Sequence, residues 1–268
     1  MIKKPLILSL LSVLLFGCSV KQNTAHFFAG EHITRTEVPL SGHITGSEQQ
    51  LPTVERLSVI GPFNVNIQVI SNPYVSNPNT INVAMSGDSA LIEHAQDFVQ
   101  DGTLKVFMDN TYTYDPNAKI QLTLVVYHSA LKQVYYDGQG QVDIQPLNAQ
   151  HFSLIMHSGG SAFMAGHADR LDLLAKGNAS INAKCVYADA VFVNTVDSAQ
   201  AEVLGGEGVS GLAANTSNIY YYGRPDLAAP YQRQSGSMMA MEGILPSQMP
   251  PAENQIPVPS QPEDFGIK

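Results

Sequence analysis

The chain has 268 residues, and its 23 acidic and 14 basic side chains give a formal net charge of −9 at pH 7. An acidic surface without basic clusters argues against nucleic-acid binding and against electrostatic binding to anionic lipids. The only cysteines are Cys18 and Cys185. If Cys18 is modified, no disulfide forms within the chain, so the core has to come from apolar burial, with Cys185 as a small buried hydrophobe.

Residues 1–17 predict a signal peptide. Two lysines precede the apolar stretch 6–16, which is too short to span a bilayer as a helix. The stretch ends in Leu-Phe-Gly-Cys, which resembles the bacterial lipoprotein signal, where cleavage falls before a cysteine that is then lipidated. The resemblance implies a lipid on Cys18, attachment to a membrane through it and, with Ser19 following, sorting to the outer membrane. An ordinary secretory signal is the alternative, and the periplasmic or surface orientation stays open.

Composition divides the rest of the chain into three parts. Residues 18–52 are polar without a sustained period and are interpreted as the lipid anchor and a tether. Residues 53–225 are long enough for one domain. Residues 226–268 are rich in Pro, Gln and Ser, cannot bury enough apolar surface, and are predicted to be disordered.

The first half of the domain reads as strands. Apolar and polar residues alternate over 63–69 and 120–126, the two-residue period of a half-buried strand. Shorter runs appear at 81–85 and 104–108. One helix is predicted, over 90–99, because apolar residues there recur every four positions.

The second half repeats a short phrase of two small or turn-forming residues, each followed by a spacer, and usually an apolar residue. Its anchors stand 21, 18, 20 and 18 residues apart, a period typical of a solenoid whose coils bury their apolar faces against one another. Asp and Asn replace Gly at two anchors, and these residues tolerate left-handed backbone best. We therefore predict an all-β fold, a right-handed parallel β-helix-like solenoid with a less regular N-terminal half. The anchors are Gly138, Gly159, Gly177, Asp197 and Asn215.

Four segments in this order resemble the GIN domain, a family described as a putative auto-transporter adhesin head domain. They are the entry strand 59–65, the segment 99–106, the repeated Gly-x-Gly phrase, and the closing run Ile-Tyr-Tyr-Tyr-Gly-Arg-Pro at 219–225. The resemblance covers about 57–225. It implies an all-β, helix-like fold outside the cytoplasm, and it implies no catalytic residues, because the function of the family is unknown.

Candidate catalytic groups have simpler interpretations. His157 stands beside Ser158, but the Gly-x-Ser-x-Gly elbow is missing and the stretch falls on a repeat corner. The histidines have no metal-ligand spacing, and no motif predicts a metal or another cofactor. Four carboxylates could line one face, as in a polysaccharide-active enzyme, which needs two of them at a set separation. The four are Asp137, Asp143, Asp172 and Asp197.

The most suggestive residues are Tyr220, Tyr221 and Tyr222. In a strand Tyr220 and Tyr222 share one face and Tyr221 takes the other. Tyrosines offer flat, amphipathic area for a protein or polysaccharide partner, although they could also cover the open end of the solenoid. We expect a lipid-anchored envelope protein, not an enzyme, that serves adhesion or partner binding. The alternatives are a periplasmic structural or assembly protein and an envelope polysaccharide-active enzyme.

Overall fold

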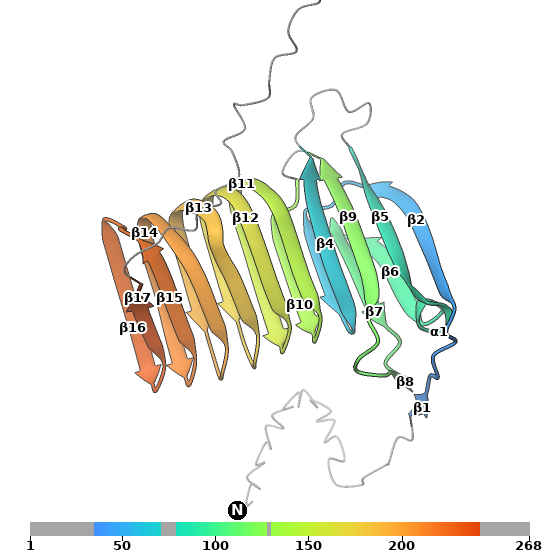
Figure 1. The fold of residues 1–268 in the computed structure, drawn as a ribbon. Coiled ribbons are helices and arrows are strands. Elements are labelled where there is room, and N and C mark those ends of the chain that lie inside the picture. Colours follow the sequence, from blue (N-terminus) through green and yellow to red (C-terminus); the bar gives the residue numbers. More distant parts are fainter. Residues whose placement is uncertain (1–34, 71–78, 128–129, 242–268) are drawn as a thin grey trace, which may run out of the picture. The chain divides into compact units, whose positions relative to one another are not determined.

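The structure is a computed structural model that describes residues 35–70, 79–127 and 130–241. These residues all belong to one compact unit. The described part is built almost entirely of strands (Figure 1). Its one helix is a single turn, Ser89–Ile92 (α1). No helix among the described residues is long and apolar enough to cross a membrane.

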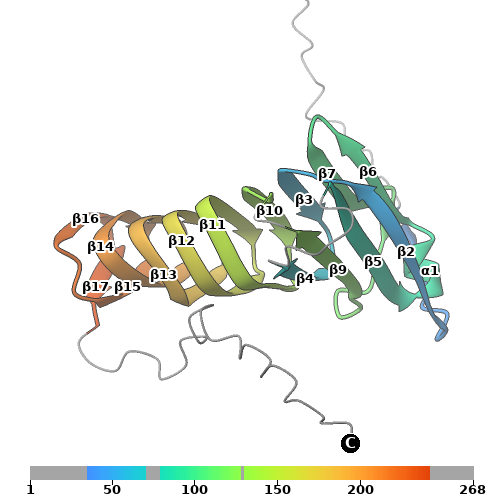
Figure 2. The ribbon, with the colours of Figure 1, turned by 90° about the horizontal axis from the view of Figure 1, so that it is seen from above.

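The regular half consists of four long parallel strands that follow one another in space as in sequence. Each strand bends near its middle, where the register to its neighbour shifts, so its two parts lie in two facing layers (Figure 2). Apolar residues at alternate positions fill the space between the layers. The strands are Gln141–Ser158 (β11), Ser161–Ala175 (β12), Ser180–Thr195 (β13) and Gln200–Asn215 (β14).

We call the layer that holds the first parts of β11–β14 sheet A, and the layer that holds their second parts sheet B. Sheet A ends in Asn218–Gly223 (β15) and Ser237–Ala240 (β17), whereas sheet B ends in Leu227–Gln234 (β16). One segment in sheet B and the next in sheet A form a coil. This arrangement confirms the predicted parallel, β-helix-like solenoid.

The corner from sheet B into sheet A is a backbone feature, as predicted. Gly177, Asp197 and Asn215 all have positive φ angles, between 64° and 76°. The predicted anchor Gly159 is wrong by one position, because Ser158 carries the positive φ there, and Gln234 extends the series by one coil. The left-handed residues are therefore 19, 20, 18 and 19 positions apart, a more even period than the sequence anchors show.

The N-terminal half adds coils out of chain order. Arg56–Ile60 (β3) and Phe63–Ile70 (β4) form the coil next to Gln133–Gly138 (β10) and β11. Thr103–Met108 (β7) and Ile120–Tyr127 (β9) form the coil beyond it. This inverted order explains why the repeat is not visible there, and it confirms the less regular N-terminal half.

Antiparallel strands close this end of the solenoid. Ile44–Pro52 (β2) pairs with Thr80–Asp88 (β5), which pairs with β9, and Ala95–Gln100 (β6) pairs with β7. The Gln49 amide on β2 donates to the Asp97 carboxylate on β6 across 2.6 Å, which links the last strands of the two sheets. Two short strands, Thr36–Glu37 (β1) and Tyr112–Thr113 (β8), form a separate pair.

Three predictions from the sequence need correction. The segment 44–52 is not a tether, because its backbone pairs along the whole of β5. Residues 227–240 are not disordered, because they form a complete coil on β14 and β15. The predicted helix 90–99 is wrong beyond residue 92: the chain enters β6, since pairing with β7 outweighs the four-residue spacing. Residues 1–34, with Cys18, and 242–268 lie outside the described part.

Candidate binding surface

The three consecutive tyrosines lie on β15 and divide between the two faces of sheet A, as predicted. Tyr221 points inward and packs against the core, whereas Tyr220 and Tyr222 lie on the outer face, and all three are half-buried. They do not cover the end of the solenoid, because β17 follows β15 in the sheet and pairs with Asn218–Tyr221. The interpretation of the tyrosines as an end cap is therefore wrong.

The outer face around Tyr220 and Tyr222 contains an ion pair. Lys184 Nζ lies 2.5 Å from Glu202 Oε2 and 5.7 Å from the centre of the Tyr222 ring. Glu202 is the register partner of Tyr220 in the next strand, and Met239 is the partner on the other side. The hydrogen bond to Glu202 raises the pKa of Lys184, so the ammonium stays charged beside the ring. The arrangement is a flat patch with aromatic, cationic and anionic groups.

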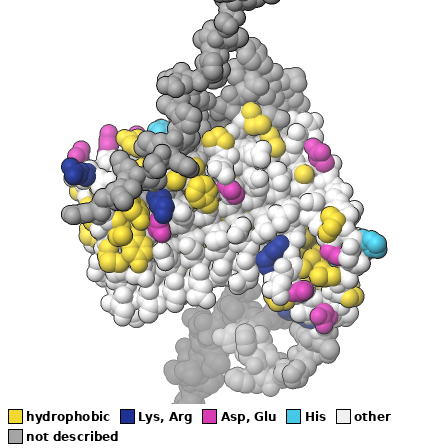
Figure 3. All heavy atoms as spheres, viewed as in Figure 1, with side chains coloured by type: hydrophobic (Ala, Val, Ile, Leu, Met, Phe, Trp, Pro, Cys, Tyr) yellow, Lys and Arg dark blue, Asp and Glu magenta, His cyan; other side chains and the backbone are white. Residues whose placement is uncertain are grey.

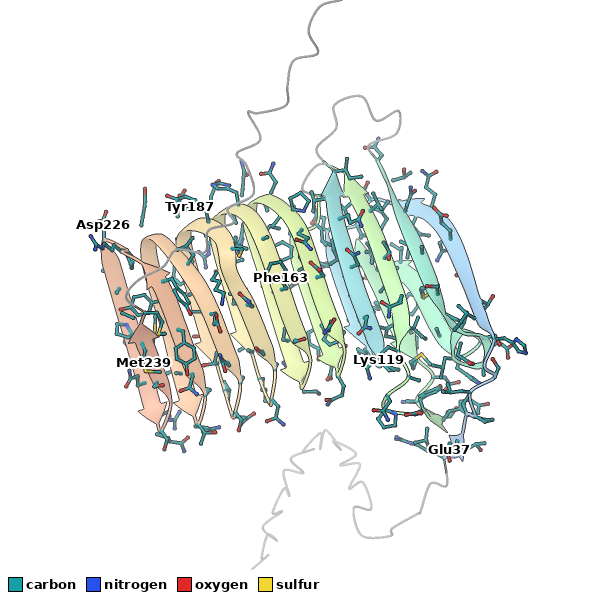
Figure 4. All side chains as sticks on the ribbon, in the orientation of Figure 1. Glu37, Lys119, Phe163, Tyr187, Asp226 and Met239 are labelled. Atoms are coloured by element: carbon teal, nitrogen blue, oxygen red, sulfur yellow. The ribbon has the colours of Figure 1, made fainter. Side chains whose placement is uncertain are left out.

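Phe163 extends this outer face toward the middle of the solenoid. Phe163 is 36% exposed on this face (Figure 4). Its register partners in the neighbouring strands are Asp143 and Asn182. One side-chain oxygen of each partner, Asp143 Oδ1 and Asn182 Oδ1, is buried and has no hydrogen-bond partner among the described residues. Figure 3 shows hydrophobic side chains gathered on this side of the molecule over the C-terminal coils. We call Phe163, Lys184, Glu202, Tyr220, Tyr222 and Met239 the sheet A patch.

The opposite outer face, on sheet B, carries a different cluster. Arg170 forms an ion pair with Asp172, and its guanidinium lies 4.3 Å from the centre of the Phe192 ring. His151 Nε2 is 2.8 Å from Asp172 Oδ2. At the bend between the sheets, His167 stacks on Tyr187 with ring centres 5.9 Å apart. Except for the Arg170–Asp172 pair, which lies within β12, these contacts join side chains of adjacent coils, so they stabilise the stack as well as offering polar surface.

The histidine and serine at the repeat corner do not form a catalytic pair. Ser158 Oγ donates to Asp137 Oδ1 of the preceding coil, whereas the His157 ring packs against Tyr135 with centres 5.3 Å apart. Ser158 is also the residue with a φ of 71°. Its hydroxyl and backbone are therefore used by the corner itself.

The four candidate carboxylates lie apart and are engaged separately. Asp172 lies on the outer face of sheet B with Arg170, and Asp143 on that of sheet A, where it accepts from Gln145. At the corners, Asp137 accepts from Ser158 and Asp197 from Asn215. None of the four faces another as the paired-carboxylate chemistry requires. In the described part of the chain, no three His, Cys, Asp or Glu side chains cluster as a metal site would need.

Cys185 differs in placement from the expectation, and Tyr136 has a structural role that the sequence patterns did not indicate. Cys185 is half-buried and not fully in the core, because one extra residue at the bend of β13 shifts the register between Phe163 and Ala165 and interrupts the alternation. Tyr136 is fully buried: its hydroxyl donates to the Phe63 carbonyl and accepts from the Gly140 N–H. The glycines around it were the available signal, because they leave room for a ring inside the corner.

Comparison with known proteins shows the family of the chain and solved structures with a similar fold. The family model described as "Putative auto-transporter adhesin, head GIN domain" matches residues 64–225, more than half the chain. A solved structure of a putative adhesin from Bacteroides fragilis shares 16% identity over 75% of this chain and 98% of that one, with a TM-score of 0.58. A putative adhesin from Parabacteroides merdae shares 14% identity over 77% and 100%, with a TM-score of 0.46. A search of curated proteins found no similar sequence.

Proposed function

Because the chain belongs to the family described as putative auto-transporter adhesins with a head GIN domain, we propose that it is a non-catalytic adhesion or binding module of the cell envelope. The lipid on Cys18 attaches it to the outer membrane, and the solenoid presents the binding surface. The support for attachment is the signal-like segment that ends at Cys18. Adhesion requires only a rigid, exposed surface, and stacked coils provide one.

The sheet A patch is the surface that we assign to binding, and the observation that carries this assignment is the outward position of Tyr220 and Tyr222 beside Lys184 and Glu202. A tyrosine ring on a flat sheet contributes contact area at little cost in side-chain entropy. The charged pair of Lys184 and Glu202 adds hydrogen-bonding capacity. A polysaccharide or a protein surface fits this combination of groups.

Two experiments test the proposal. Protease treatment of intact cells that produce the whole chain reports orientation: we expect digestion of the solenoid, whereas complete protection contradicts a surface role and favours a periplasmic assembly protein. Glycan and envelope-protein arrays then report binding by the purified chain. Tyr220→Ala with Tyr222→Ala should abolish the signal, and Tyr187→Ala is the matched control, because Tyr187 is exposed on the bend and outside the patch.

A further inference from the structure

The outer face of sheet A carries an uncharged polar side chain at the same level on eight neighbouring strands. Six of these residues, one on each of β11–β15 and β17, are register partners from strand to strand. Asn64 and Gln121 continue the series on β4 and β9, and the Gln141 N–H donates to Asn64 Oδ1 at 3.0 Å. We call the six residues the amide–hydroxyl row: Gln141, Ser161, Ser180, Gln200, Asn218 and Ser237.

The side chains of this row are accessible and lightly engaged within the described chain. Two of the six residues are exposed and four are half-buried. Ser237 Oγ donates to Asn218 Oδ1, and the Gln200 amide reaches Glu202 Oε1 only at 3.5 Å. An amide both donates and accepts, so Gln141 and Gln200 can each bond to two neighbouring hydroxyl groups of a ligand. Neighbouring strands lie about 4.8 Å apart, so the row offers such groups at a regular interval.

A second row, two residues further along the strands, contains rings of the sheet A patch. Phe163 follows Ser161 on β12, and Tyr220 follows Asn218 on β15. Since alternate residues of a strand share one face, these rings lie beside the amide–hydroxyl row. The rings offer flat apolar area, and the row offers donors and acceptors. A sugar ring has apolar C–H faces and hydroxyl groups at its edge, so it matches the two rows together.

The charges on this face favour an uncharged ligand. The outward positions of β4, β11–β15 and β17 in sheet A hold three charged side chains, Asp143, Lys184 and Glu202. Lys184, the cation among them, is paired with Glu202 at 2.5 Å. A polyanion would therefore meet the carboxylate of Asp143 and no unpaired cation on these strands. The net charge of −9 on the chain adds to this repulsion.

A protein partner fits the same face less well. The centre of a protein interface is an apolar area around a few buried anchors, with polar groups at its rim. Here single rings stand among amide, hydroxyl and charged groups, and the amide–hydroxyl row recurs in each coil. A regular series of hydrogen-bonding groups matches a partner that is itself a chain of repeating units.

We propose that the sheet A patch and the amide–hydroxyl row together bind an uncharged polysaccharide. The polymer lies across the strands, with sugar rings against Phe163 and Tyr220 and hydroxyl groups against the row. This inference rests on the binding role proposed above and names the ligand class of that surface. It also enlarges the site, because the six residues of the row lie outside the patch.

Affinity electrophoresis of the purified whole chain, in native gels with a mild detergent, tests the ligand class. The gels contain a β-glucan, a mannan, a xylan or amylose as uncharged polymers, or polygalacturonate as an acidic one. We expect at least one uncharged polymer to retard the chain, with an affinity that is the same at low and high salt. Retardation by polygalacturonate alone, or by none of the polymers, overturns the proposal.

Variants of the row test whether it takes part. Gln141→Ala with Gln200→Ala should weaken binding of the retarding polymer about tenfold, because two side-chain hydrogen bonds are lost. Gln96→Ala with Gln150→Ala is the matched control, since both glutamines are exposed and lie outside sheet A, on β6 and at the bend of β11. Equal binding by the two double variants would contradict a role for the row. Circular dichroism of each variant checks that the strands persist.

Oligosaccharides of the retarding polymer test whether the ligand lies across the strands. They should compete more strongly as they become longer, because each added sugar reaches a further strand. A disaccharide that competes as well as the longest oligosaccharide would place binding at one point and overturn the arrangement.

The envelope-protein array separates this inference from the proposed function. If no polysaccharide retards the chain but a protein binds it and is lost in the Tyr220→Ala, Tyr222→Ala variant, the polysaccharide inference fails and the binding role stands. If neither a polysaccharide nor a protein binds, both fail.

Discussion

The hydroxyl of Tyr136 donates to the backbone carbonyl of Phe63 in the preceding coil, across 2.8 Å. The same oxygen accepts the Gly140 N–H at 2.6 Å. A Cβ on Gly140 would lie 2.7 Å from this oxygen, so the glycine makes room for the contact. In the later coils the corresponding register positions hold smaller side chains, such as Ala175 and Ala213. The Tyr136 ring fills this space in its own coil, and its hydrogen bond to Phe63 connects the irregular half to the regular one.

Tyr136→Phe should lower the free energy of unfolding by about 1–3 kcal/mol, because it leaves a buried carbonyl and a buried N–H without their partner. Urea denaturation monitored by circular dichroism measures the change. Tyr187→Phe is the control, since Tyr187 is exposed and its substitution should change little. Equal stability of the Tyr136→Phe variant and the wild type would show that the bond contributes nothing net.

The contribution of Tyr136 should also depend on pH. Burial raises the pKa of the Tyr136 phenol to about 12, from an ordinary value near 10.0. The folded state therefore holds this proton to higher pH than the unfolded state, so the stabilisation is complete below pH 10 and is lost as pH rises toward 12. The stability difference between the wild type and Tyr136→Phe should shrink over this window. A difference that stays constant between pH 10 and 12 would contradict the assignment.

Gly102, in the turn between β6 and β7, and Gly177, at a corner of the solenoid, separate two kinds of strain. Gly102 and Gly177 both have positive φ, but a Cβ at Gly102 meets nothing within 4 Å, whereas a Cβ at Gly177 collides with the Ser158 carbonyl of the preceding coil. Gly102→Ala should cost about 1–2 kcal/mol, the price of left-handed backbone alone. Gly177→Ala should cost more by about 1–3 kcal/mol, because the coils must separate. Thermal unfolding of the two variants side by side measures the difference.

The last coil should be part of the folded unit. A chain that ends at residue 225 loses β16 and β17 and exposes Val209 and Ile219, which are now buried. Each exposed side chain should cost up to about 1.5–3 kcal/mol. A chain that ends at residue 241 keeps both strands and should unfold at the same temperature as the whole chain. If the two truncated chains were equally stable, the terminal coil would not contribute to the fold.

How far the sequence predicts this structure depends on how local each signal is. Gly177, Asp197 and Asn215 mark corners because the left-handed backbone restricts the residue type. The strands of residues 227–240 were missed because Pro230 and the prolines beyond residue 241 dominate the composition, although proline is tolerated on a terminal strand. The inverted order of β3 and β7 depends on pairing between distant segments, which alternation within one strand does not encode.

Of the sheet A patch, the sequence indicated only the features that are local to one strand. Strand parity correctly put Tyr220 and Tyr222 on one face and Tyr221 on the other. Their neighbours come from other coils: Lys184 and Glu202 reach them through register and through the extra residue at the bend of β13. No spacing within the chain shows which side chains of separate coils become adjacent.

Adhesion of cells that produce the whole chain tests the central claim most directly. Cells with the wild-type chain, with Tyr220→Ala and Tyr222→Ala together, or with Tyr187→Ala are compared, at equal surface amounts, for adhesion to the target that the arrays identify. The account predicts adhesion with the wild type and with Tyr187→Ala, and its loss with the double variant. Adhesion that is unchanged in the double variant, or absent in the wild type, would contradict a binding role for the sheet A patch.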